Sequence, residues 1–131
     1  MKQTIIMEKY PVNELGIAKN ETTFKTVDEI LNALKEKIEA HPIAAYIAIF
    51  DHYSHTESLG KNGEISDEIL DAKNIIFCFG KQLPKPIMLA VRPRSIGVVE
   101  LAESFVLSFM DAPNPQAHEA MIVWVQSIVN K

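Results

Sequence analysis

The sequence has 131 residues and a mass of 14.7 kDa, which is the size of one domain. Hydrophobic residues make up 47% of it, charged residues 23%, and the net charge is only -4, so a disordered chain is excluded. No window approaches the ~18 uninterrupted apolar residues of a transmembrane helix. A mildly acidic chain also lacks the surplus of Lys and Arg that nucleic-acid binding needs.

The start of the chain, residues 1–9, has too short an apolar core for a signal peptide, and Glu8 interrupts it. A single cysteine, Cys78, cannot form an internal disulfide, and its apolar neighbours predict an inert, buried thiol. We therefore expect a cytoplasmic domain over residues 1–131, with neither nucleic acid nor a membrane as its partner.

The first forty residues predict a short strand, a break and one long helix. The strand is expected at residues 3–7, and a second β-leaning segment at residues 21–24 leads into the helix. Thr26 followed by Glu29 is a capping box, and apolar residues then recur at helical spacing up to His41-Pro42, where the helix ends. The break between the two β-leaning segments is assigned to Pro11, Asn13 and Gly16.

Two apolar runs predict the centre of a sheet. Residues 43–50 are apolar without interruption, which is typical of a strand buried on both faces, and residues 75–79 form a second core strand that ends at Gly80. Between these runs, residues 51–63 are polar and predict a loop. Ser66 is a candidate N-cap for a short helix after this loop.

The last third of the chain contains one ambiguous segment between two predicted helices. Pro86 can begin a short helix up to Ala90, and Asn114 can cap a final helix whose first residue is Pro115. Residues 96–110 fit a helical period, which favours a helix. The same residues also divide into two β-rich runs, so a hairpin is the alternative.

Motifs at three strand ends resemble a bacterial family. The run Ala48-Ile49-Phe50-Asp51-His52, followed by Leu59-Gly60, is similar to its strand that ends in Asp-His before a small residue and Gly. The run Ile76-Phe77-Cys78-Phe79-Gly80 stands where that family has Ile-Phe-Gly, and residues 109–113 are similar to its later strand end. Over about residues 22–113 the chain thus resembles the domain of unknown function family three hundred and two.

This resemblance implies a compact α+β sandwich with helices on one sheet, and it assigns residues 96–110 to a hairpin. The family is functionally uncharacterised, so the resemblance implies no chemistry. We therefore predict an α+β fold, a single compact domain with a mixed β-sheet, helices packed on it and a C-terminal helix.

The segment from Asp51 to Glu57 is the only one dense in potential ligands, because it also contains His52 and His55. One interpretation is a metal site or an acid–base centre. The other is that Asp51 and His52 hydrogen-bond the end of a buried strand. The spacing matches no established metal motif, and the sequence has neither a phosphate-binding glycine loop nor a nucleophile elbow. No metal, cofactor or catalytic residue is therefore assigned.

A local excess of positive charge is the second candidate site. The segment from Lys81 to Val99 contains Lys81, Lys85, Arg92 and Arg94 but no Asp or Glu. Arg92 and Arg94 suit bidentate contacts to a carboxylate or phosphate, so we predict a weak anion-binding patch; solvated surface is the alternative. A parallel pairing of the two core strands would place this patch beside Asp51 and His52.

The function that these patterns favour is a non-catalytic binding module for a small anionic ligand or a protein partner. The alternative is a metal-binding or acid–base enzyme that uses Asp51, His52 and His55. In the final helix, Ile122 and Val123 lie off the main apolar face and widen it. This excess apolar surface predicts self-association as a two-fold homodimer.

Overall fold

A computed structural model describes residues 1–130. The helices are α1 (Val27–Ala40), α2 (His52–Ser58) and α3 (Pro115–Gln126), with three short 3-10 helices, η1 (Lys19–Glu21), η2 (Gly60–Asn62) and η3 (Pro86–Val91). The strands are β1 (Lys2–Ile6), β2 (Tyr10–Ala18), β3 (Ala45–Phe50), β4 (Asp71–Cys78), β5 (Arg94–Glu100) and β6 (Ser104–Met110).

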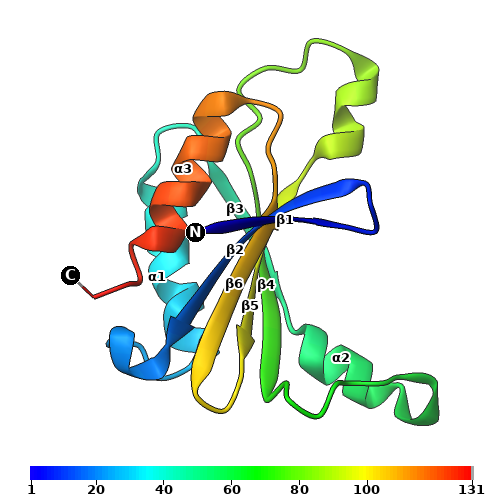
Figure 1. Ribbon diagram of the computed structural model, residues 1–131. Coiled ribbons are helices and arrows are strands. Elements are labelled where there is room, and N and C mark those ends of the chain that lie inside the picture. The colour runs from blue at the N-terminus through cyan, green and yellow to red at the C-terminus, as the bar shows by residue number, and fades with distance from the viewer. Residues whose placement is uncertain (131) are drawn as a thin grey trace.

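The strands form one six-stranded sheet in the order β1-β2-β6-β5-β4-β3. Helices α1 and α3 lie on the same face of this sheet, whereas α2 and η3 lie at its two ends (Figure 1). The α+β class and the C-terminal helix are confirmed. The expected mixture of parallel and antiparallel strands is wrong, because the strands of residues 1–130 pair antiparallel throughout.

Helix α1 begins where the capping box predicts. The Oγ1 atom of Thr26 accepts a hydrogen bond from the Glu29 amide at 3.1 Å, and the Glu29 carboxylate accepts one from the Lys25 amide at 2.9 Å. The helix ends before His41-Pro42. Its apolar stripe is buried against the sheet, which makes α1 the centre of the core; the stripe consists of Val27, Ile30, Leu31, Leu34 and Ile38.

The predicted break near the N-terminus is instead the strand β2. Pro11 is tolerated because it lies one residue before the ladder with β6 begins. Asn13 is buried, but its side-chain amide donates to the Asp111 carboxylate at 2.6 Å, so its polarity is satisfied inside the sheet. Residues 21–24 form no strand, since η1 and an extended connection occupy this stretch.

Strand β3 is present, but the prediction that it is buried on both faces is wrong. It is an edge strand, and Ile47 is 51% exposed. The predicted loop at residues 51–63 folds into α2 and η2 because Asp51 caps α2. After it, the helix expected at Ser66 is only one turn, closed by a hydrogen bond from the Ile69 amide to the Ser66 carbonyl.

The ambiguous segment forms the β5–β6 hairpin that the family resemblance implied. Its turn is closed by a hydrogen bond of 2.8 Å from the Leu101 amide to the Ser104 carbonyl. The side chains of Phe105, Leu107 and Phe109 are buried at every second position, as in a strand. Strand β6 pairs with β2, and β5 pairs with β4. A helix in this segment would leave both β2 and β4 without these partners, so the hairpin forms instead.

Candidate functional site

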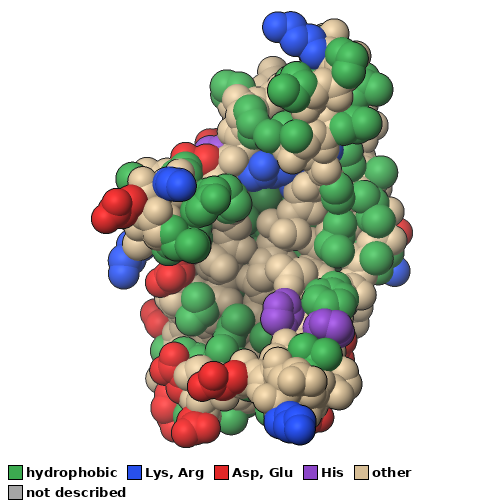
Figure 2. Space-filling view, turned by 90° about the vertical axis from the view of Figure 1, so that its right-hand side faces the viewer, with side chains coloured by type: hydrophobic (Ala, Val, Ile, Leu, Met, Phe, Trp, Pro, Cys, Tyr) green, Lys and Arg blue, Asp and Glu red, His purple; other side chains and the backbone are tan. Residues whose placement is uncertain are grey.

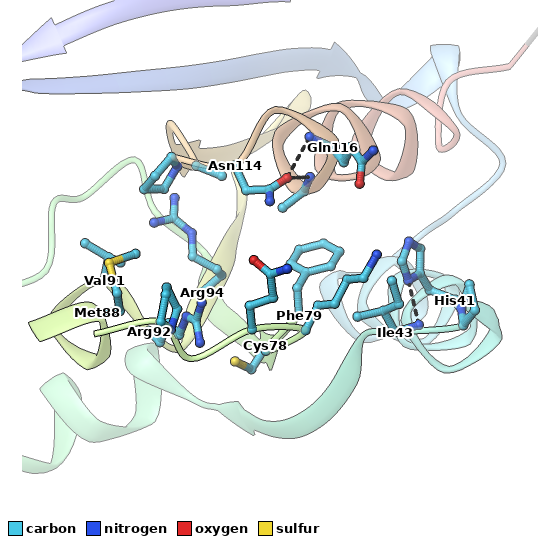
Figure 3. A pocket seen from close by; sticks show the side chains of 18 residues that line it. His41, Ile43, Cys78, Phe79, Met88, Val91, Arg92, Arg94, Asn114 and Gln116 are labelled. Carbon is cyan, nitrogen blue, oxygen red and sulfur yellow. Dashed lines mark hydrogen bonds between the residues drawn. The ribbon is translucent and has the colours of Figure 1, made fainter. Parts of the chain in front are cut away.

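A cavity of about 670 Å³ opens at the end of the sheet where β4 ends and α3 begins. Three elements surround it: the α1–β3 connection, the segment between β4 and β5, and the first turn of α3 (Figure 3). Its lining residues are His41, Pro42, Ile43, Cys78, Phe79, Gly80, Lys81, Gln82, Pro84, Met88, Val91, Arg92, Arg94, Ala112, Pro113, Asn114, Gln116 and Ala117. This volume is typical of small-molecule sites in proteins, which span ~300–1,000 Å³.

The charge of the lining is one-sided. Lys81, Arg92 and Arg94 all face the cavity, and none of the residues that line it within residues 1–130 is an Asp or Glu. Three of the four basic residues singled out in the sequence are therefore brought together. The fourth, Lys85, does not line the cavity.

Arg94 has two roles at this site. Its Nη2 atom donates hydrogen bonds to the carbonyl oxygens of Met110 and Asp111, at 2.5 and 2.8 Å, which fixes the connection from β6 to α3. Its Nε atom is buried and has no partner within residues 1–130. Burial lowers the pKa of the Arg94 guanidinium, and the Asp111 charge partly offsets this shift. The guanidinium is thus a cation with unused donor capacity at the cavity wall.

The first turn of α3 adds a positive electrostatic potential from the opposite side. Asn114 is the N-cap, and its Oδ1 atom accepts hydrogen bonds from the amides of Gln116 and Ala117 at 2.8 and 3.1 Å. These two amides are therefore already occupied. The positive end of the helix dipole still points towards the cavity, and the Asn114 and Gln116 side chains lie along its rim (Figure 3).

The rest of the lining is largely apolar. The ring of Phe79 forms part of the wall and stacks on Trp124, with 5.6 Å between the ring centroids and 8° between the planes. His41 contacts both rings edge-on and accepts hydrogen bonds from the amides of Ile43 and Ala44 through Nδ1. On another side, Met88 and Val91 project from η3. A ligand in this cavity would meet cations and apolar surface together.

Cys78 differs from the sequence expectation of a fully buried thiol. It is half-buried and lines the cavity, because side chains alternate along β4 and Cys78 follows the core residue Phe77 on the opposite face. Gly80 adopts a positive φ of 55°, a conformation that favours glycine, and this turn directs Lys81 towards the cavity. Because the sequence has one cysteine, the thiol is a site-specific reporter of the cavity.

Asp51, His52 and His55 lie at the other end of the sheet. The expectation that the basic patch sits beside them is wrong because β3 and β4 pair antiparallel, which places the end of β3 opposite Asn74 and the end of β4 opposite Ala45. The two histidine rings pack near the Phe50 ring, with centroids 5.6 and 5.5 Å from it. Within residues 1–130, no group of three or more His, Cys, Asp or Glu side chains is placed to hold a metal ion.

Asp51 has a structural role, but it differs from the expected hydrogen bond to the end of a buried strand: Asp51 caps α2, and the His52 ring pairs with the Thr56 hydroxyl in the same helix. The Asp51 carboxylate accepts a hydrogen bond from the Ser54 amide at 2.9 Å, as the N-cap of α2. That bond, together with nearby Lys73, lowers the pKa of Asp51.

Lys73 was not singled out by the sequence, although it joins three elements. Its Nζ atom lies 2.6 Å from the carboxylate of Asp28, 3.7 Å from that of Asp51 and 3.9 Å from that of Asp71. The hydrogen bond to Asp28, followed by the three negative charges, raises the pKa of Lys73. The start of α1, the start of α2 and β4 are thereby tied together.

A third polar cluster stabilises the connection from β6 to α3 behind the cavity. The Asp111 carboxylate accepts hydrogen bonds from the side-chain amides of Asn13, at 2.6 Å, and Gln3, at 3.0 Å. His118 lies 3.9 Å from this carboxylate and accepts a hydrogen bond from the Ala112 amide through Nδ1. No sequence motif connects Gln3 and Asn13 to Asp111, which lies 108 and 98 positions further along the chain, so only the fold could bring them together.

One family model matches the chain. It is described as a family of unknown function (DUF6858), and it covers residues 1–130. It differs from the family that the strand-end motifs resembled, so that resemblance holds only at the level of a family without known function. No curated protein and no solved structure matches the chain. No helix of residues 1–130 has the length and apolar character needed to cross a membrane.

Proposed function

Because the chain belongs to this family of unknown function, we propose its function from the site: it is a non-catalytic binding module whose cavity takes a small organic anion. The observation that carries the proposal is the lining of the cavity. Lys81, Arg92 and Arg94 converge there, and no lining residue within residues 1–130 is acidic. The dipole of α3 favours the same sign of ligand charge.

The shape of the cavity favours an anion with an apolar body over a simple inorganic ion. A carboxylate or phosphate ester would place its charged group between Arg94, Arg92 and the start of α3. Its apolar part would then cover Phe79 and the η3 side chains Met88 and Val91. Because the cations are partly open to solvent, their contribution is screened by salt, and we expect affinity to fall as ionic strength rises.

The test uses the single tryptophan. Trp124 stacks on the cavity wall at Phe79, so a ligand that displaces water from Phe79 should change its fluorescence. Benzoate, octanoate and inorganic phosphate are titrated at low salt, with the thermal midpoint as a second signal. We expect the two organic anions to bind and Arg92→Met to weaken both. Lys85→Met removes the same charge outside the cavity and is the matched control.

The proposal is contradicted if none of the three anions changes the fluorescence or the thermal midpoint. It is also contradicted if Lys85→Met weakens binding as much as Arg92→Met, because the effect would then be one of net charge. Protection of the Cys78 thiol from a modifying reagent by benzoate would place the bound anion in the same cavity.

Two further features belong to this proposal. The single cysteine has no partner within residues 1–130, which suits a cytoplasmic protein. Self-association through α3 is supported by Val123, which is 54% exposed, whereas Ile122 is half-buried against the core and offers less surface.

A further inference from the structure

The η3 helix leaves most of its apolar surface uncovered. Its six residues, Pro86–Val91, are all apolar. In a 3-10 helix residues i and i+3 share a face, so Met88 and Val91 form the face that lines the cavity. The side chains of the other faces have no such cover: Ile87 is 75% exposed and Leu89 is 61% exposed. A helix that is apolar on all sides is normally buried.

Leu83, just before η3, extends the same surface and is 64% exposed. We name Leu83, Ile87 and Leu89 the apolar ridge. It projects from the body of the molecule at the end opposite α2 (Figure 1). Figure 2 shows hydrophobic side chains gathered at this projecting end, with Lys and Arg side chains beside them.

The charge around the ridge has one sign. Lys81, Lys85 and Arg92 flank it, and none of them takes part in an ion pair within residues 1–130. The first acidic residue after Lys81 is Glu100. Between Leu83 and Val91 the only polar side chain is Lys85. The surface therefore offers aliphatic area and positive charge, and almost no hydrogen-bonding groups.

We infer that the apolar ridge docks on a bilayer surface that contains anionic lipids. Exposed aliphatic side chains can enter the boundary between headgroups and acyl chains, while Lys and Arg stay with the anionic headgroups. A second copy of the chain fits less well, because a two-fold contact through the ridge would bring two sets of unpaired cations together. A protein partner would need hydrogen-bond donors and acceptors at the rim, whereas the charged side chains that flank the ridge are all cations and can only donate.

This inference departs from the sequence expectation of no membrane partner. That expectation rested on the lack of a spanning apolar stretch, and sequence hydropathy does not reveal which short apolar segments the fold leaves uncovered. Lys81 and Arg92 belong to both surfaces, but the residues that distinguish the ridge from the proposed anion site, Leu83, Ile87, Leu89 and Lys85, do not line the cavity.

The experiment is co-sedimentation of the full chain at low salt with two kinds of vesicle. One kind contains phosphatidylglycerol mixed with phosphatidylcholine, and the other is phosphatidylcholine alone. We expect binding to the anionic vesicles only. Replacing two inserted aliphatic side chains in Ile87→Ser/Leu89→Ser should weaken binding by about a hundredfold. Lys85→Gln should weaken it by about fivefold.

Two controls separate docking from loss of structure or of ligand binding. Leu70→Ser removes an aliphatic side chain that is 50% exposed just before β4, at a position outside the ridge, the cavity and α3, and should bind vesicles like the parent. The double serine variant should unfold at the parent's urea midpoint and keep the parent's response to benzoate. A failure of the anion site would abolish the benzoate response and leave vesicle binding intact.

The inference is overturned if the parent does not sediment with anionic vesicles, or if the double serine variant binds them equally well. It is also overturned if the parent is a dimer that the double serine variant converts to a monomer while vesicles capture no protein. The ridge would then be a contact between copies of the chain.

Discussion

Arg94→Met should destabilise the protein although methionine keeps much of the aliphatic length of the side chain. The guanidinium holds the connection between β6 and α3 through two hydrogen bonds, to the carbonyls of Met110 and Asp111. Methionine cannot donate either bond. The two carbonyls must then find water at the wall of the cavity.

The change in the free energy of unfolding depends on the two hydrogen bonds that are lost and on the unpartnered Nε atom that is removed. A hydrogen bond from a charged donor contributes about 1.5–3 kcal/mol, so two such bonds contribute about 3–6 kcal/mol. Methionine also removes the Nε atom, which is buried without a partner and costs about 1–3 kcal/mol as it stands. The half-exposed site reduces the difference further, since water can replace part of the lost bonding. We expect a net loss of about 2 kcal/mol in the free energy of unfolding.

Urea unfolding followed by Trp124 fluorescence measures this loss. Arg92→Met is the matched control, because Arg92 also lines the cavity but its side chain makes no hydrogen bond within residues 1–130, and its effect should stay within about 0.5 kcal/mol. If both variants unfold at the parent's midpoint, Arg94 does not hold the connection. If both lose about 2 kcal/mol, the cause is the charge and not the two carbonyls.

Three further predictions concern Asp51, Lys73 and self-association through Val123. Asp51→Ala should cost about 1 kcal/mol in thermal or urea unfolding, whereas Asp51→Asn, which can still cap α2 at Ser54, should cost less. Because the folded pKa of Asp51 is lowered, its contribution should be complete above about pH 4 and lost as the pH falls through the folded value; Asp51→Asn should not show that loss. Lys73→Met should cost about 1 kcal/mol at low salt, and the contribution of Lys73 should persist at neutral pH and disappear as the pH rises through its raised pKa. Light scattering should give a dimer for the parent and a monomer for Val123→Lys; a monomeric parent at micromolar concentration would contradict self-association.

Local signals in the sequence predict the helices well. Helix α1 combines a capping box, an apolar stripe and a terminating proline, and α3 combines Asn114 with Pro115 at its start. Each of these signals acts within a few residues, so no tertiary contact is needed to interpret them. The same reasoning fails for α2. The polar character of residues 51–63 predicts a loop, whereas Asp51 is the N-cap of a helix in that segment.

Strands are predicted less well, because the neighbouring strands determine whether a segment becomes a strand and how deeply it is buried. Asn13 and Pro11 disfavour a strand locally. In the fold, β1 and β6 pair with this segment, and the Asp111 carboxylate accepts a hydrogen bond from the Asn13 side chain. The apolar run at β3 predicts burial on both faces, and the order of the sheet places it at an edge. Strand order depends on contacts between distant segments, which periodicity does not record.

The candidate site shows the same division. The acid-free interval from Lys81 to Val99 predicts the cations, and three of the four line one cavity. Their neighbours were not predictable, since Phe79, His41 and Asn114 come from three separate elements. The antiparallel pairing of β3 and β4 also moves Asp51 to the far end of the sheet, which separates the two candidate sites.

Asn114 provides the last prediction, because it competes with any anion for the start of α3. Its Oδ1 atom accepts from the amides of Gln116 and Ala117, so a bound anion cannot use those two donors in the parent protein. Asn114→Ala should lower the free energy of unfolding by about 1 kcal/mol, the usual cost of a lost N-cap. It should also release both amides towards the cavity, where a helix start favours anions.

Phosphate should therefore raise the thermal midpoint of Asn114→Ala more than that of the parent, since the anion replaces the missing cap. Sodium chloride at equal ionic strength is the control for screening. Arg92→Met in the same background should reduce the gain, because the anion then loses one of the cations beside it. An equal rise in both proteins would mean that the amides at the start of α3 do not face the anion, and the charged group of the ligand would have to be placed at Arg92 and Lys81 alone.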